Sequence, residues 1–229
     1  MRGKIYCIGV GPGDPELMTL KTVRILREVD VVAAPGKVVE ETIAFKIAAQ
    51  AVPEIAEKRS LPLDAPMVRE PGELAAAHAA SAATVAELLD QGLDVAYLTL
   101  GDPTLYCSFS YLQDLLGERG FEVKLVSGVT SISAAAARAG IPLAQWDEPL
   151  RVIPAAHADV ASLADQLAQP GTCVFMKPSA NLPAIKEAIS TSGREVITIE
   201  RCGLENERIH RGADAIPDEL PYLSIIIVR

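Results

Sequence analysis

Short apolar runs alternate with stretches of helical periodicity along most of this chain, and that alternation limits the folds open to it. The run Lys4–Val10 ends in glycines, and Val29–Ala34 stops at Pro35, so both are predicted to be short buried strands. Between them, Thr19–Glu28 carries apolar residues at helical spacing, and Asp94–Leu100 is a further buried strand later in the chain. Alternation of this kind predicts an α/β fold with a largely parallel sheet.

The last part of the chain is richer in strands. Three apolar runs follow one another without a helix between them: Glu195–Glu200, Glu207–Arg211 and Leu223–Val228. Consecutive strands favour antiparallel pairing, so we expect a second α/β domain. The glycines at 117 and 120 flank a charged turn, where we place the boundary. Residues 1–118 then form an N-terminal α/β domain, and residues 119–229, including the strand Glu122–Ser127, form a C-terminal α/β domain with a strand-rich end.

Composition argues against several classes of protein. The net charge is −9 and no basic run occurs, so a nucleic-acid partner is not expected. No apolar stretch approaches ~18 residues and no signal peptide precedes the first strand, so we expect a cytoplasmic protein without a membrane partner. The four cysteines are far apart, and so are His78, His157 and His210, so no metal site is expected.

Three loops carry small or polar residues directly after predicted strands. Gly9–Pro15 (GVGPGDP) follows the first strand, and Thr99–Tyr106 (TLGDPTLY) follows Asp94–Leu100 and leads into a predicted helix over Leu105–Leu116. Ligands of open α/β sheets bind at the carboxyl ends of strands, so these two loops are expected at one edge. The third loop, Ser127–Ser131, offers backbone N–H groups and hydroxyls. Each loop alone also fits an ordinary turn or helix cap.

A dinucleotide-binding turn is the first alternative for the glycine-rich loop. That motif requires a third glycine at its sixth position, where this chain has Asp14 followed by a proline. It also requires an acidic residue after the second strand. In this chain the second strand ends at Ala33–Gly36, which contains no acidic residue. A dinucleotide-dependent oxidoreductase therefore stays a distant alternative.

Taken together, the motifs GVGPGDP, LGDPTLY and GVTS resemble the tetrapyrrole (corrin/porphyrin) methylase family in order and spacing, and the resemblance covers nearly the whole chain. It implies two α/β domains with the active site in the cleft between them. It also implies S-adenosylmethionine as methyl donor, a tetrapyrrole substrate and a homodimer.

The resemblance assigns residues to the cofactor site by their place in the family's motifs. These residues are Pro12, Gly101, Asp102, Tyr106, Thr130, Ser131, Met176 and Cys202. Tyr106 is also the candidate catalytic proton acceptor, by position, while His157 after a predicted strand is a weaker one. Two positions depart from the family pattern: Ser127 stands where a proline is common, and Cys107 where Ser or Thr is expected.

The segments GDPTLYCSFSYL and GVTSISAAAARAGIPLAQWDEPLRVIPA are most similar to members that methylate C-20 of precorrin-2 or cobalt-factor II, on the route to cobalamin. Uroporphyrinogen III, another precorrin position, a diphthine precursor and a non-enzymatic tetrapyrrole carrier stay open, as does the presence of cobalt in the substrate. Such substrates carry many carboxylates, which pair well with cations. The candidate cations in predicted loops or at strand ends are Lys37, Arg59, Arg69, Lys177 and Arg201.

Overall fold

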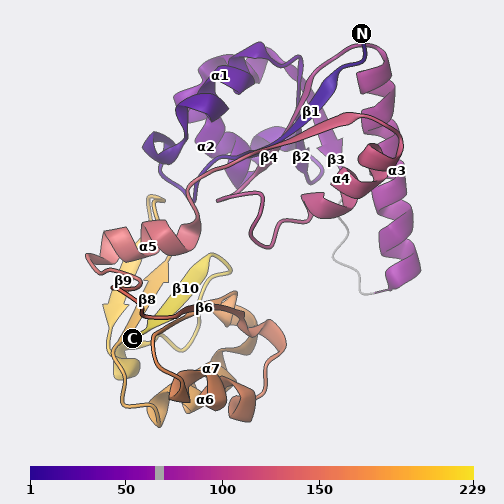
Figure 1. Cartoon of the computed structure of the whole chain (residues 1–229). Helices are drawn as coiled ribbons and strands as arrows, with labels where there is room; N and C mark the ends of the chain where they lie inside the picture. The colour runs from indigo at the N-terminus through magenta and orange to yellow at the C-terminus, as the bar shows by residue number, and fades with distance from the viewer. Residues whose placement is uncertain (65–69) are drawn as a thin grey trace. The chain divides into compact units, whose positions relative to one another are not determined.

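The chain folds into two compact α/β units, Met1–Thr130 and Ser131–Arg229 (Figure 1). The structure, a computed structural model, describes residues 1–64 and 70–229. The candidate cation Arg69 lies outside the described residues. The α/β fold class is confirmed, and each unit is built around its own five-stranded sheet.

The sheet of the first unit is entirely parallel, with the strand order β3-β2-β4-β1-β5. Its strands are β1 (Lys4–Gly9), β2 (Val31–Pro35), β3 (Arg59–Leu63), β4 (Val95–Thr99) and β5 (Glu122–Val126). Its helices are α1 (Leu20–Glu28), α2 (Ile43–Ala51), α3 (Pro71–Asp90) and α4 (Phe109–Glu118). In Figure 1, α1 and α2 lie on one side of the sheet and α3 and α4 on the other. Parallel strands covered on both faces explain the continuous apolar runs in the sequence.

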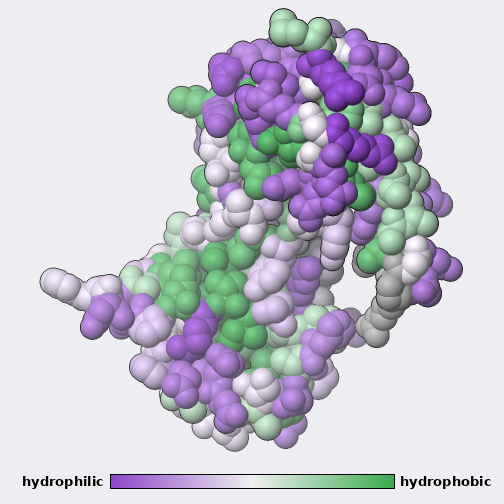
Figure 2. Space-filling view, turned by 45° about the vertical axis from the view of Figure 1, so that its right-hand side comes forward, coloured by the Kyte–Doolittle hydropathy of each residue, from purple (hydrophilic) through white to green (hydrophobic). Residues whose placement is uncertain are grey.

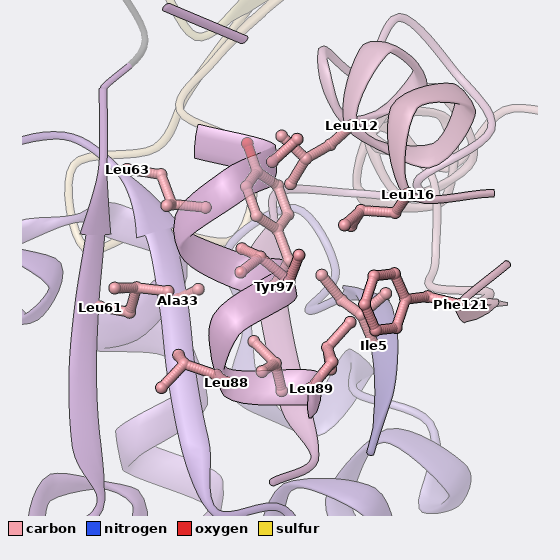
Figure 3. Close-up of a cluster of buried hydrophobic side chains, with 14 of the residues drawn as sticks. Ile5, Ala33, Leu61, Leu63, Leu88, Leu89, Tyr97, Leu112, Leu116 and Phe121 are labelled. Atoms are coloured by element: carbon pink, nitrogen blue, oxygen red, sulfur yellow. The ribbon is translucent and has the colours of Figure 1, made fainter. Parts of the chain in front are cut away.

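The core between the first sheet and α3 and α4 is mainly aliphatic (Figure 3). Alternate residues of β1, such as Ile5 and Cys7, point to this side because side chains alternate along a strand. Leu89 of α3 and Leu116 of α4 meet them and are fully buried. This packing orients β1 and β4, whose carboxyl ends carry the glycine loops.

The second unit has a mixed sheet with the order β6-β7-β10-β8-β9. Its strands are β6 (Leu150–Pro154), β7 (Thr172–Met176), β8 (Val196–Glu200), β9 (Arg208–Arg211) and β10 (Ser224–Val228). Its helices are α5 (Ser131–Ala139), α6 (Val160–Ala168) and α7 (Leu182–Ser190). Only β6 and β7 are parallel; the other neighbours are antiparallel, as the consecutive strands predicted. Helices α6 and α7 pack on one face, and α5 contacts β8 and β10.

The boundary between the units differs from the one that we expected after residue 118. Strand β5, expected in the C-terminal domain, pairs in parallel with β1 from Lys4↔Glu122 to Ile8↔Val126. The first unit therefore continues to Thr130. The glycines at 117 and 120 belong to the end of α4 and the following turn, which reverse the chain into this strand.

The helix expected at Leu105–Leu116 also begins later than predicted, at Phe109. Tyr106 has a left-handed backbone, with φ of 54°, which a right-handed helix does not accommodate. Turns and bends lie between β4 and Phe109, so the loop after β4 is longer than its apolar pattern suggested.

The α-helices other than α3 span 9 or 10 residues, and α3 spans 20. Helix α1 buries Thr22, Ile25 and Leu26, and its first turn is capped by Thr19, whose hydroxyl oxygen accepts a hydrogen bond from the Thr22 N–H at 3.2 Å. Within residues 1–64 and 70–229, no helix combines the length and apolar character that crossing a membrane requires.

Candidate functional site

The three predicted loops of the first unit come together at the carboxyl edge of its sheet. They follow β1, β4 and β5, which are neighbours in the order β4-β1-β5 and run parallel. The first two loops were expected at one edge of the sheet, and the structure confirms this. Because β5 belongs to this sheet, the loop after it, Ser127–Thr130, reaches the same edge.

Backbone hydrogen bonds join the first two loops directly. Gly11 and Gly101 form an antiparallel bridge, with N···O distances of 3.2 Å and 2.8 Å. Their φ angles are 79° and 67°, which glycine adopts without steric cost. The bridge fixes the positions of both Gly-Asp-Pro turns relative to each other.

Glycines at the loop junction permit very close backbone contacts. A Cβ on Gly9 would lie 2.5 Å from the Gly101 carbonyl oxygen, and a Cβ on Gly128 would lie 2.2 Å from the same atom. The obstructing atoms belong to the backbone, so they cannot move aside as a flexible side chain would. These glycines therefore allow the three loops to pack against one another.

Hydrogen bonds to the Asp102 carboxylate connect the second and third loops. One carboxylate oxygen accepts hydrogen bonds from the Thr104 N–H at 2.8 Å and from the Thr104 hydroxyl, and the other accepts from the Gly128 N–H at 2.9 Å. Burial raises the pKa of Asp102, but the hydrogen bonds together lower it by more. The net pKa therefore lies below its ordinary value. Asp102 is thus an ionised carboxylate that accepts hydrogen bonds from Thr104 and Gly128. Its contact with a cofactor stays a prediction.

Pro12 and Tyr106, the other predicted residues of these loops, differ in exposure. Pro12 is buried, whereas 46% of Tyr106 is exposed. The left-handed φ of Tyr106 is uncommon for a bulky residue and is typical of functional sites. The structure therefore leaves Tyr106 accessible to a ligand, as a candidate proton acceptor must be.

Cys107, which departs from the family pattern, lies in the loop after β4. Its Sγ lies 3.4 Å from Thr99 Oγ1 and accepts a hydrogen bond from the Phe109 N–H at 3.5 Å. A hydrogen bond with Cys7 is the main cause that lowers the pKa of Cys107 to about 6, and burial and Asp102 oppose it. Cys7 and Cys107 are far apart in the sequence, so no local signal predicted that Cys7 affects the pKa of Cys107.

Met176 and Cys202 lie at the carboxyl ends of two strands, β7 and β8, of the second sheet. Met176 ends β7 and pairs with Ile225, while Cys202 follows Glu200, which ends β8 and pairs with Ser224. Cys202 is buried and Met176 half-buried. The structure thus brings the predicted residues together in two groups, one in each unit. The cleft between the units stays a prediction.

Two more predicted cofactor residues flank the boundary between the units along the chain. Thr130 is the last residue of the first unit and Ser131 begins α5 in the second; both are half-buried. His157, the weaker catalytic candidate, is exposed at the end of a short 3₁₀ turn after β6.

Arginines hold the loop after β8 against α5. Arg138 Nε on α5 donates to both Glu207 oxygens at 2.9 Å and 3.1 Å, and Glu207 also accepts from the Gly203 N–H at 2.6 Å. Arg211 donates to the Ala139 carbonyl oxygen at 2.5 Å. The segment that carries Cys202 is therefore anchored at its far end.

The geometry argues against the dinucleotide alternative. The loop after β1 enters a short 3₁₀ turn, Pro15–Leu17, capped by the Asp14 carboxylate. The helix whose N-terminus would hold a pyrophosphate begins only at Leu20. The structure defines instead a two-unit α/β protein with glycine loops packed at a sheet edge.

Comparisons with known proteins agree with this class. The chain belongs to the family Tetrapyrrole (Corrin/Porphyrin) Methylases, which it matches over residues 4–213. It is similar to the precorrin-2 C(20)-methyltransferase of Sinorhizobium sp, with 35% identity over 99% of this chain and 95% of the relative. It is 32% identical to the cobalt-precorrin-2 C(20)-methyltransferase of Salmonella typhimurium, over 100% of this chain and 97% of the relative.

A solved structure shows the same fold. The uroporphyrin-III C-methyl transferase of Thermus thermophilus, complexed with S-adenyl homocysteine, superimposes with a TM-score of 0.70. The match covers 99% of this chain and 97% of that structure at 22% identity. The resemblance to the tetrapyrrole methylases stated from the sequence is confirmed.

Proposed function

We propose that this protein transfers a methyl group from S-adenosylmethionine to C-20 of precorrin-2 or of cobalt-factor II, in cobalamin biosynthesis. The observation that carries the proposal is similarity over essentially the full length to relatives named for C(20) methylation of precorrin-2 and of cobalt-precorrin-2. Support for the methyl donor comes from the family and from the S-adenyl homocysteine in the similar uroporphyrin-III enzyme.

The loop cluster of the first unit suits a catalyst that works by positioning. The bound methyl donor supplies an electrophilic methyl group, and an electron-rich meso carbon of the ring is the nucleophile. The protein's task is to hold the two in line and to exclude water, which favours rigid backbone over mobile side chains. The bridged glycines and the Asp102 hydrogen bonds supply that rigidity. Tyr106 is exposed and is our candidate to accept the meso proton.

Methyl transfer from labelled S-adenosylmethionine, under anaerobic conditions, tests the proposal. Precorrin-2, cobalt-factor II and uroporphyrinogen III are offered separately, and mass spectrometry and NMR locate the new methyl group. We expect a C-20 product from precorrin-2 or cobalt-factor II, and the preferred substrate shows whether cobalt is present. Methylation of uroporphyrinogen III or at another ring position would contradict the C-20 assignment. Absence of cofactor binding would contradict methyl transfer altogether.

Lys177 and Arg201 are the cations that we propose to bind substrate carboxylates. They directly follow β7 and β8, which flank β10, so their backbones are about 10 Å apart given the usual strand spacing. Both have left-handed φ angles, 55° and 51°. Neither side chain has a hydrogen-bonded or ion-paired partner in the described part of the chain. Strained, unpaired cations at a sheet edge suit a polycarboxylate ligand.

Replacing Lys177 or Arg201 with alanine is expected to raise the KM for the tetrapyrrole about tenfold or more, because a charge-assisted hydrogen bond contributes roughly 1.5–3 kcal/mol. The Kd for the methyl donor should not change. Arg24→Ala is the matched control, since Arg24 pairs on the exposed face of α1 with Glu28. Steady-state kinetics and calorimetry measure both constants. An unchanged KM in both variants would remove these residues from the substrate site.

We also propose that the protein is a homodimer. Hydrophobic surface is visible on the C-terminal unit in Figure 2. Large exposed hydrophobic side chains of this unit are Trp146, Leu150, Ile209 and Tyr222. Exposed apolar surface is typical of protein–protein contacts. Sedimentation equilibrium is expected to give twice the mass of the 24.3 kDa chain, and a single-chain mass at every concentration would contradict the proposal.

We place the enzyme in the cytoplasm. All four cysteines are free, which is typical of proteins from a reducing compartment.

A further inference from the structure

The loop that joins β8 to β9, residues 201–207, carries two residues of the proposed site. Arg201 is a proposed substrate cation, and Cys202 is a predicted cofactor residue. The residues on both sides of Cys202 have left-handed backbones, with φ of 51° at Arg201 and 76° at Gly203. A left-handed backbone at an arginine is unfavourable and persists only where surrounding contacts impose it. The contacts that hold this loop therefore determine how both site residues are presented.

Glu207, at the far end of the loop, makes the side-chain contacts that close it. Its Oε2 accepts a hydrogen bond from the Gly203 N–H at 2.6 Å. Arg138 Nε donates to both carboxylate oxygens of Glu207, at 2.9 Å and 3.1 Å. Only 14% of the Glu207 side chain is exposed, so these charge-assisted hydrogen bonds are largely shielded from water and salt. The carboxylate is thus a fixed part of the loop.

The same carboxylate connects the loop to helix α5, which contacts β8 and β10 (Figure 1). Arg138 lies in the last turn of α5, and Arg211 of β9 donates to the carbonyl oxygen of the last residue of this helix. The first residue of α5 is Ser131, another predicted cofactor residue. Because a short helix behaves as one rigid element, Glu207 joins the loop to the element that begins with Ser131.

We propose that Glu207 is a positioning residue for the methyl donor: it holds the loop and α5 in one arrangement before the donor binds, without touching the donor. This inference rests on the proposed function and adds a residue to it. Without the carboxylate, the Gly203 N–H and Arg138 lose their shared acceptor, and the strained backbone at Arg201 can relax. A smaller fraction of the protein is then ready to bind, and the apparent Kd rises in proportion. Once the donor is bound, the arrangement is the same, so kcat changes little.

Calorimetry with S-adenosylhomocysteine and steady-state methyl transfer compare Glu207→Ala with wild type. We expect the Kd for S-adenosylhomocysteine and the KM for the methyl donor to rise about tenfold, while kcat changes by less than about threefold. Glu205→Ala is the matched control, because Glu205 is an exposed carboxylate of the same loop, and its constants should equal those of wild type. Glu207→Gln keeps an acceptor for the Gly203 N–H but loses the ion pair with Arg138, so its Kd should lie between those of wild type and Glu207→Ala.

A double-mutant cycle tests the connection through Arg138. Arg138→Ala should also raise the Kd, and adding Glu207→Ala to it should raise the Kd by less than the product of the two single effects. Hydrogen exchange of the peptide that contains residues 201–207, in the protein without ligand, should be faster in Glu207→Ala and unchanged in Glu205→Ala. If Glu207→Ala does not fold, Glu207→Gln and Arg138→Ala decide the proposal by the same measurements.

The opposite results overturn the proposal. An unchanged Kd in Glu207→Ala does so, and so does a fall in kcat with an unchanged KM, which would place Glu207 in the chemical step. Equal hydrogen exchange in wild type and Glu207→Ala would show that the carboxylate does not hold the loop. If wild type itself binds no S-adenosylhomocysteine, the proposed function fails, while hydrogen exchange still decides whether Glu207 holds the loop.

Discussion

Replacing Gly128 with alanine is expected to lower the free energy of unfolding by about 3 kcal/mol, at the upper end of the usual cost of overpacking. The new Cβ would lie 2.2 Å from the Gly101 carbonyl oxygen and 2.8 Å from the Gly9 carbonyl group. Because both neighbours are backbone, the loops have to separate, and the bridge between Gly11 and Gly101 is strained. Urea denaturation measures the stability, and calorimetry with S-adenosylhomocysteine measures the site.

Gly117→Ala is the matched control for this substitution. Gly117 lies in α4, where an added Cβ meets no atom within 4 Å. Alanine there is expected to stabilise the protein by about 0.5–1 kcal/mol, because glycine is unfavourable within a helix. Equal effects of the two substitutions would show that the close approach of the three loops is not what holds the site together.

Removing the Asp102 carboxylate is expected to have an effect of similar size. Asp102→Ala leaves the N–H groups of Thr104 and Gly128 without their acceptor in a partly buried position. The loss is expected to be about 2–4 kcal/mol of stability, since hydrogen bonds to charged groups contribute roughly 1.5–3 kcal/mol each and are not additive. Methyl transfer should fall by at least about tenfold, because the loops that position the donor lose their connection.

Asp102→Asn separates the charge from the shape of the side chain. The amide keeps one acceptor oxygen, so its effect should lie between those of wild type and alanine. Asp90→Asn, at an exposed ion pair with Arg2, is the control and should cost less than about 1 kcal/mol. An Asp102→Ala protein as stable and active as wild type would show that the hydrogen bonds do not join the loops in solution.

The same carboxylate predicts a dependence on pH. The pKa of Asp102 is lower in the folded protein than its ordinary value of 3.8, so the unfolded chain takes up a proton more readily. The stability that Asp102 contributes is therefore present above about pH 4 and is lost as the pH falls through the folded pKa. Denaturation at pH 7 and pH 3 should show a smaller acid-induced loss in Asp102→Asn than in wild type.

Local patterns in the sequence identified most elements but not their partners. The apolar run before Gly9 and the one before Gly101 predicted β1 and β4 and placed their loops at one edge. Strand β5 was predicted as a strand but assigned to the wrong unit. Its apolar pattern is a local property, whereas its pairing with β1 joins residues more than a hundred positions apart.

The backbone conformation of single residues could also not be predicted from the sequence. Tyr106, Lys177 and Arg201 have left-handed φ angles, although none is a residue that favours this region. Only the surrounding strands and turns impose the conformation, so propensity did not predict it. For Tyr106 the consequence was a predicted helix start that was wrong.

Residue types at short spacing were enough to predict the alternation of buried strands and helices, the glycine turns and the family. Only the folded chain shows that Gly9 and Gly128 allow the loops to pack closely and that Asp102 joins two loops. These contacts form only after β4, β1 and β5 lie side by side. Pairing of distant strands is set by the burial of whole faces rather than by any local signal, which is why the site's internal connections appear only in the folded protein.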